Sequence, residues 1–127
     1  MKEFVATEWD RARTALRTAW QLCPTDPDSA ASRAYYAAFH ALTALFALRG
    51  DMFKKHSALR AALHRDLVKT GVLDRERGRD FDFLMDLRET GDYGGVMRVS
   101  TDSAESAAAK AEAFVLAVAE LHPELRL

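Results

Sequence analysis

Apolar side chains recur every three to four positions along most of the chain, and no segment alternates apolar and polar residues as a β-strand does. The chain is therefore predicted to be all-α. One stripe of the first expected helix is formed by Val5, Trp9, Ala12 and Leu16. Glu8 and other charged residues are expected largely elsewhere. The predicted helices cover residues 2–22, 27–49, 55–70, 74–90 and 103–121.

Proline, aspartate and glycine mark the expected helix ends. Pro24 ends the first helix, because proline lacks the N–H that a helix interior requires. Asp26 is the expected N-cap of the second helix, with Pro27 at its first position, where a missing N–H costs nothing. Asp102 and Glu105 resemble a capping box at the start of the last helix. Glycines are expected to end the second, third and fourth helices, at Gly50, Gly71 and Gly91.

Short turns between antiparallel helices predict an up-and-down four-helix bundle with an additional short or split helix. A chain of 127 residues suffices for one core, so residues 1–127 are expected to form a single domain. The helix at 27–49 is the most aromatic and the least charged, and we expect it at the centre. Its aromatic content exceeds what one small bundle buries, which predicts a homodimer.

Composition and charge narrow the class of partner. The chain is 49% hydrophobic and 29% charged with a net charge of -1, so no global positive field recruits nucleic acid, and any RNA contact must come from a local patch. The longest apolar stretch, residues 34–48, is too short to cross a bilayer of about 30 Å as a helix. The N-terminus lacks the features of a secretory signal. We expect a cytoplasmic protein without membrane association, in which the single Cys23 is a small buried residue.

Arg33, Tyr36 and His40 form a stripe on the second expected helix. Positions seven apart fall within about 20° of one another and about 10.5 Å apart along the axis. An arginine can hold a phosphate and a histidine can move a proton near neutral pH. Arg33 and His40 are therefore candidate catalytic residues, and Tyr36 is a candidate ligand-binding residue. The spacing equally fits a histidine hydrogen-bonded inside the bundle and an arginine paired with an acid.

A second candidate site lies at the end of the fourth expected helix, in the sequence RETGDYGG at 88–95. Here Arg88, Asp92 and Tyr93 adjoin an irregular segment expected over residues 91–101, and loops on rigid scaffolds often carry function. The glycines allow close approach of a ligand, and Tyr93 offers a hydroxyl or a stacking ring. Alternatively, Arg88 and Asp92 form an ion pair within the helix, worth a few tenths of a kcal/mol.

Lys54, Lys55 and His56 make a local basic cluster at the start of the third expected helix. Helix N-termini attract anions, so these residues are candidates for binding a nucleic acid or a nucleotide, although such a cluster also fits a solvated face. No pair of histidines or carboxylates has the spacing of a zinc or di-iron site, and no metal or cofactor is predicted. Three acidic residues of the fourth helix are interpreted as surface charges: Asp80, Asp82 and Asp86.

Three ordered blocks resemble the HEPN domain: SRAYYAAFHALTALFALRG, KKHSALRAALHRDLVKTGVLD and LRETGDYGG, followed by the closing helix ESAAAKAEAFVLAVAEL. The resemblance extends over about 100 of the 127 residues. In detail the chain is similar to small stand-alone members with an SRAYYAxFHA, KxHS and RxxxDY pattern. The resemblance implies a helical bundle that dimerises and is often encoded beside a minimal nucleotidyltransferase. Many relatives are toxin components or RNA-cleaving defence proteins.

The resemblance also implies a chemistry. Ribonucleases of the family use an arginine followed four to six residues later by a histidine, and they need no metal ion. In this chain Arg88 is followed by Asp92 and Tyr93, with no histidine at that place, whereas Arg33 and His40 have a similar spacing in the second helix. Some relatives carry, near the position of Tyr93, a tyrosine that the partner nucleotidyltransferase modifies with AMP. Enzymatic activity is left open.

Two functions follow from these observations. In the first, a dimeric HEPN protein of a toxin–antitoxin or nucleotidyltransferase-linked system binds RNA or a nucleotide and cleaves RNA without metal. Arg33, His40 and Arg88 would then converge on an open cleft, with Asp92 and Tyr93 beside them. In the second, the chain is a non-catalytic module that binds a partner protein. Arg88 would then be satisfied by Asp92 or another carboxylate, and the cleft would be absent.

Overall fold

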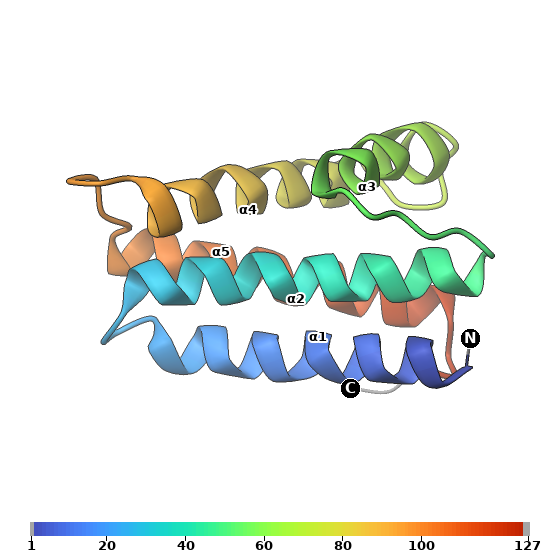
Figure 1. The fold of residues 1–127 in the computed structure, drawn as a ribbon, viewed down its shortest axis with the longest axis horizontal. Helices are drawn as coiled ribbons and strands as arrows, with labels where there is room; N and C mark the ends of the chain where they lie inside the picture. Colours follow the sequence, from blue (N-terminus) through green and yellow to red (C-terminus); the bar gives the residue numbers. More distant parts are fainter. Residues whose placement is uncertain (1, 126–127) are drawn as a thin grey trace.

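A computed structural model describes residues 2–125 as a bundle of helices (Figure 1). Four of them are long, and a short α-helix continues directly into a π-helical turn. This confirms the all-α class and the up-and-down bundle of four long helices with one split helix. The elements are α1 (Lys2–Leu22), α2 (Pro27–Leu48), α3 (His56–Ala62), η1 (Leu63–Val68), α4 (Arg75–Tyr93) and α5 (Thr101–Leu121).

Helix α2 lies at the centre, as its composition predicts. It packs on α1, on α4 and on α5, which run along it on three sides (Figure 1). Alanines on several faces of α2 are buried, and their small side chains let the neighbouring helices approach closely. The largest side chains that fill the remaining space are Tyr35, Phe46, Phe81 and Phe114. None of the helices within residues 2–125 is long and apolar enough to span a bilayer.

The predicted caps of α2 are present. The side chain of Asp26 accepts a hydrogen bond from the backbone N–H of Ser29 at 3.2 Å, and Pro27 occupies the first helical position. Beyond the ends of α2 and η1, Gly50 and Gly71 adopt φ angles of +85° and +83°, which other residues rarely adopt. Local sequence signals therefore determine these boundaries.

The prediction that Gly91 breaks the fourth helix is wrong, because α4 continues to Tyr93. Gly91 lies against the first turn of α2, where a Cβ atom would come within 2.7 Å of the backbone oxygen of Asp28. The glycine is thus needed for close packing between α4 and α2 rather than for a turn. The irregular segment is accordingly shorter than expected and covers residues 94–100.

The last helix also begins differently from the expectation. Ser100 is its N-cap, and its hydroxyl accepts a hydrogen bond from the backbone N–H of Ser103 at 3.0 Å. Asp102 lies inside the first turn, where its negative charge interacts favourably with the positive, N-terminal end of the helix dipole. The predicted capping box at Asp102 and Glu105 was therefore placed two residues too late.

Asp80 is not a surface charge, in contrast to the prediction for the acids of α4. It is 4% exposed, and its Oδ2 atom lies 3.0 Å from the Nε atom of Arg77 without the alignment of a hydrogen bond. Burial raises the pKa of Asp80, against the opposing effects of Arg77 and Lys110. Asp82 is half-buried between Arg60 and His64, and the side chain of Asp86 is exposed.

We predict that Gly91→Ala destabilises the protein by about 1–3 kcal/mol, because the added methyl group overpacks the contact with α2. In an unpacked helix the same change would stabilise by about 1 kcal/mol. Denaturant unfolding followed by circular dichroism measures the difference. Glu89→Ala, an exposed position on the same turn, is the control and should change little. A Gly91→Ala variant more stable than the wild type would contradict the contact.

We predict that Asp80→Asn raises the melting temperature at pH 7 by roughly 2–5 °C. A carboxyl whose pKa is raised in the folded state contributes stability at low pH and loses it as the pH rises through that pKa. The advantage of the variant should therefore shrink as the pH falls and the wild-type side chain itself becomes protonated. Asp86→Asn, on the exposed face of α4, serves as the control. A less stable Asp80→Asn at pH 7 would show that the pair with Arg77 outweighs the cost of burial.

Candidate functional site

Arg33, Tyr36 and His40 lie along one half-buried stripe of α2. The guanidinium carbon of Arg33 is 5.0 Å from the centroid of the Tyr36 ring, and the ring centroids of Tyr36 and His40 are 6.0 Å apart. The three side chains thus contact one another in the order of the sequence, with the tyrosine between the cation and the imidazole.

Glu8 of α1 binds the imidazole of His40. Its Oε2 atom is 2.5 Å from the Nδ1 atom of His40, and its Oε1 atom is 3.8 Å from Arg11. Glu8 is buried, contrary to the expectation that it lies off the apolar stripe of α1. Sequence reasoning missed this residue. The sequence does contain a sign of its burial: this carboxylate lies three positions after Val5 and next to Trp9, inside the apolar pattern.

The surroundings of His40 favour the neutral form of its imidazole. Burial lowers the pKa of His40 below its ordinary value of 6.5, and the charges of Arg11 and Arg33 lower it further, although the hydrogen bond to Glu8 opposes them. A neutral imidazole has a nitrogen lone pair and can accept a proton. The chemical capacity of this site is therefore that of a base beside a cation.

A cleft of about 500 Å³ opens between α1 and α2 beside these residues. We call it the α1–α2 cleft; it is lined by Asp10, Arg11, Thr14, Ala15, Thr18, Arg33 and His40. Among residues 2–125, Arg33 forms no ion pair or hydrogen bond, and its guanidinium lies over the Tyr36 ring. A half-buried cation without a carboxylate partner, facing a cleft, is suited to an anionic ligand.

Arg88, in contrast, already forms hydrogen bonds with two other side chains. Its Nε atom donates to Oδ2 of Asp92 at 2.9 Å, and its Nη2 atom donates to the hydroxyl of Tyr36 at 3.0 Å. The pair with Asp92 forms because α4 continues through Gly91. The two residues therefore lie one turn apart on the same face of one helix. Arg88 does not line the α1–α2 cleft but lies next to it, joined through Tyr36. Tyr93 is 73% exposed, with its ring 5.7 Å from the guanidinium carbon of Arg88.

The basic cluster is divided between the surface and the interior. Lys54 and Lys55 are exposed. His56 packs inward, with its ring stacked on Phe39 at 4.4 Å between centroids and its Nδ1 atom 2.8 Å from the hydroxyl of Tyr35. Burial lowers the pKa of His56, as does the charge of Arg88. His56 therefore anchors the start of α3 to α2, and the two lysines remain at the surface.

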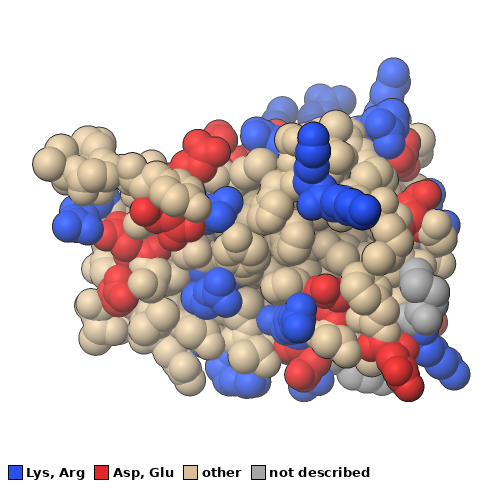
Figure 2. All heavy atoms as spheres, viewed as in Figure 1, with Lys and Arg blue, Asp and Glu red and all other residues tan. Residues whose placement is uncertain are grey.

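Charges of both signs are interspersed on the face drawn in Figure 2. This face carries no broad basic surface of the kind that binds nucleic acid without local selectivity, in agreement with the net charge of -1. Within residues 2–125, no group of three histidine, cysteine or acidic side chains is placed to hold a metal ion.

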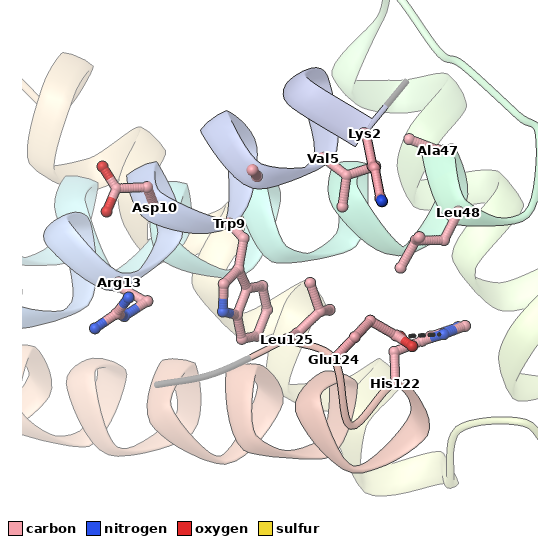
Figure 3. A pocket seen from close by; sticks show the side chains of 11 residues that line it. Lys2, Val5, Trp9, Asp10, Arg13, Ala47, Leu48, His122, Glu124 and Leu125 are labelled. Atoms are coloured by element: carbon pink, nitrogen blue, oxygen red, sulfur yellow. Dashed lines mark ion pairs between the residues drawn. The ribbon is translucent and has the colours of Figure 1, made fainter.

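A second cavity, of about 680 Å³, lies at the opposite end of α1 from its junction with α2 (Figure 3). Trp9 points into it from α1 and Leu48 from the end of α2, and an ion pair between His122 and Glu124 closes one side. Its walls are mostly apolar, and its lysine and arginine are balanced by two acids. None of the candidate residues lines this cavity, although Asp10 borders both it and the α1–α2 cleft.

Comparison with known proteins decides the family. A family model described as the HEPN domain matches residues 6–121, which is nearly the whole chain. The chain belongs to the HEPN family.

Several relatives support this assignment. The HEPN chain is 35% identical over 127 residues to a "UPF0332 protein" of Thermotoga maritima, covering 98% of this chain and 96% of that one. It is 30% identical over 88 residues to a protein of Methanocaldococcus jannaschii named "Putative toxin MJ0142", covering 69% of this chain and 60% of that one. The crystal structure of TT1696 from Thermus thermophilus has the same fold, with a TM-score of 0.77, 22% identity and coverage of 92% of this chain and 97% of that chain.

The HEPN assignment confirms the resemblance read from the sequence blocks. It leaves the roles of the individual residues as predictions. The structure of this HEPN domain brings Arg33 and His40 to one cleft, together with Glu8. Arg88 and Asp92 form a closed pair beside that cleft, which is the contact expected of a structural role.

We predict that Arg88→Ala lowers the free energy of unfolding of this HEPN domain by about 1–3 kcal/mol, because Asp92 and the Tyr36 hydroxyl both lose a half-buried partner. Arg88→Lys should recover part of the loss by keeping the charge beside Asp92. Arg79→Ala removes an exposed pair on the same helix and is the matched control. If Arg88→Ala and Arg79→Ala unfold at the same denaturant concentration, the contacts of Arg88 contribute nothing to stability.

Proposed function

We propose that this HEPN protein binds RNA or a nucleotide in the α1–α2 cleft and cleaves RNA there without a metal ion. In this proposal it is a component of a toxin–antitoxin or nucleotidyltransferase-linked system. The observation that carries the proposal is Arg33, a half-buried guanidinium with no ion pair among the described residues, beside the imidazole of His40 in an open cleft.

The proposed reaction is transfer of a phosphoryl group within the RNA. His40 accepts the proton of a ribose 2′-OH, and the 2′-oxygen attacks the adjacent phosphorus. The bond from phosphorus to the 5′-oxygen breaks, that oxygen takes up a proton, and a 2′,3′-cyclic phosphate remains. Arg33 stabilises the negative charge that develops on the phosphoryl oxygens. The step consumes no oxidant or other co-reactant, and the cation that it needs is a side chain.

The family and its named relatives support the biological setting. The Methanocaldococcus relative bears the name of a toxin, although this chain spans only 60% of its length. Tyr93 presents an exposed ring at the end of α4, and we propose it as the residue on which a partner nucleotidyltransferase acts. A homodimer is part of the same proposal. Light scattering of the purified protein should give twice the mass of 14.2 kDa.

We predict that the wild type binds single-stranded RNA and cleaves it in EDTA. Arg33→Ala should weaken binding at least about tenfold and reduce the slope of log affinity against log salt by about 0.7, which corresponds to one lost phosphate contact on a single strand. His40→Gln should bind nearly as well and lose cleavage by a factor of about 10² or more. Fluorescence anisotropy and gel analysis of labelled RNA provide the two measurements.

Arg17→Ala is the matched control, because Arg17 is an exposed arginine of α1 that does not line the α1–α2 cleft. Equal losses in Arg17→Ala and Arg33→Ala would indicate general electrostatic attraction and overturn the assignment of the cleft. Absence of both binding and cleavage by the folded wild type, between pH 5 and 9, would overturn the proposed function.

A second candidate function is a non-catalytic module that binds a partner protein. It is favoured by the closed pair of Arg88 and Asp92 and by the apolar tip of the loop between α4 and α5. There Val96 is 95% exposed and Met97 is 64% exposed. Asp28 holds the loop in place by accepting hydrogen bonds from the backbone N–H of Val99 and from Arg98. A wild type that neither binds nor cleaves RNA would favour this function over the first.

A further inference from the structure

We propose that Glu8 is a positioning residue for His40: it holds the Nδ1–H group and thereby makes Nε2 the atom that exchanges a proton with a ligand in the α1–α2 cleft. The inference rests on the proposed function and deepens it, since it adds a residue of α1 to a site otherwise formed by α2. It also assigns separate roles to the two ring nitrogens.

The burial of Glu8 calls for an explanation. A carboxylate removed from water costs several kcal/mol unless charged or hydrogen-bonded partners compensate for it. Glu8 is 8% exposed, and it also borders another cavity whose lining is mostly apolar, with Phe4 and Phe39 among its residues, and includes Thr43 and Asp51. The neighbouring inward positions of α1 are apolar. An apolar residue at position 8 would pack α1 on α2 without this cost, so packing alone does not account for a glutamate.

The geometry of the contact selects one tautomer. An ionised carboxylate can only accept hydrogen bonds, so the Nδ1 atom of His40, 2.5 Å from Glu8, must carry a hydrogen. In the neutral ring the lone pair is then on Nε2. The side chain of His40 is 16% exposed and contributes to the wall of the α1–α2 cleft. His40 is thus held by a carboxylate through one nitrogen and lines an open cleft, an arrangement suited to proton transfer through the other nitrogen.

The charged groups that face His40 decide how the site responds to pH. They are Glu8 and Arg11 from α1, Arg33 from α2 and His56 from α3. Of these, Glu8 alone raises the pKa of His40, whereas burial and the two arginines lower it. Removing the charge of Glu8 therefore lowers that pKa further. Because a general base acts in its neutral form, the acidic limb of the rate profile should move to lower pH.

The experiment compares the wild type with Glu8→Gln and Glu8→Ala in the RNA cleavage assay in EDTA. The amide oxygen of Glu8→Gln can still accept the Nδ1–H bond, so this variant keeps the orientation of the ring and loses the charge. We expect kcat to fall about 10²-fold in Glu8→Ala and less in Glu8→Gln, with KM changed less than about twofold in both. The acidic limb for Glu8→Gln should lie at lower pH than that of the wild type. Glu3→Gln, exposed in the first turn of α1, is the control.

A second measurement does not depend on activity. Nitrogen-15 NMR of the His40 ring reports which nitrogen carries the hydrogen, and we expect the Nδ1–H tautomer in the wild type and a shift toward a mixture in Glu8→Ala. A wild-type ring protonated at Nε2 would overturn the inference. So would variants that are less stable but have an unchanged kcat and pH profile, because Glu8 would then only join α1 to α2. An inactive wild type instead overturns the proposed function, and the inference with it.

Discussion

The enclosure of α2 by three other helices is the constraint on which the rest of the structure depends. Its alanines bring the neighbouring helices so close that little solvent reaches the helix. Polar groups on a helix in this position must find partners on the neighbours or face a cleft, since an unpaired buried polar group costs about 1–3 kcal/mol. The partners of the α2 stripe, Glu8 and Arg88, accordingly come from α1 and α4.

This constraint gives the two arginines near Tyr36 different properties. Arg88 is held from two directions, by Asp92 in its own helix and by the Tyr36 hydroxyl, so a phosphate would have to displace existing bonds. Arg33 rests on the same ring without a carboxylate partner among residues 2–125. Arg88, at the place of the family's motif, is thus already hydrogen-bonded within the bundle, whereas the guanidinium without an ion pair is on the central helix. In the part of the chain that the structure describes, the α1–α2 cleft places this unpaired guanidinium beside the imidazole of His40.

Much of the fold could be predicted because it follows from local rules. The apolar period defined the helices, Asp26 and Pro27 defined the start of α2, and the glycines at 50 and 71 marked two helix ends. Gly91 shows where such rules stop. Glycine terminates a helix or permits close packing, and the sequence around it does not distinguish these uses. The backbone oxygen of Asp28, more than sixty positions earlier, decided between them.

The sequence by itself determined the helical class, the central place of the aromatic helix, the shared stripe of Arg33, Tyr36 and His40, and the family. These properties depend on residues close together in the chain or on an ordered pattern of them. Only the tertiary structure decided that Glu8 binds His40, that Asp80 is buried and that Arg88 is paired while Arg33 is free. The physical reason is that burial and ion pairing depend on which side chain of another helix lies opposite, and helical periodicity carries no information about that neighbour.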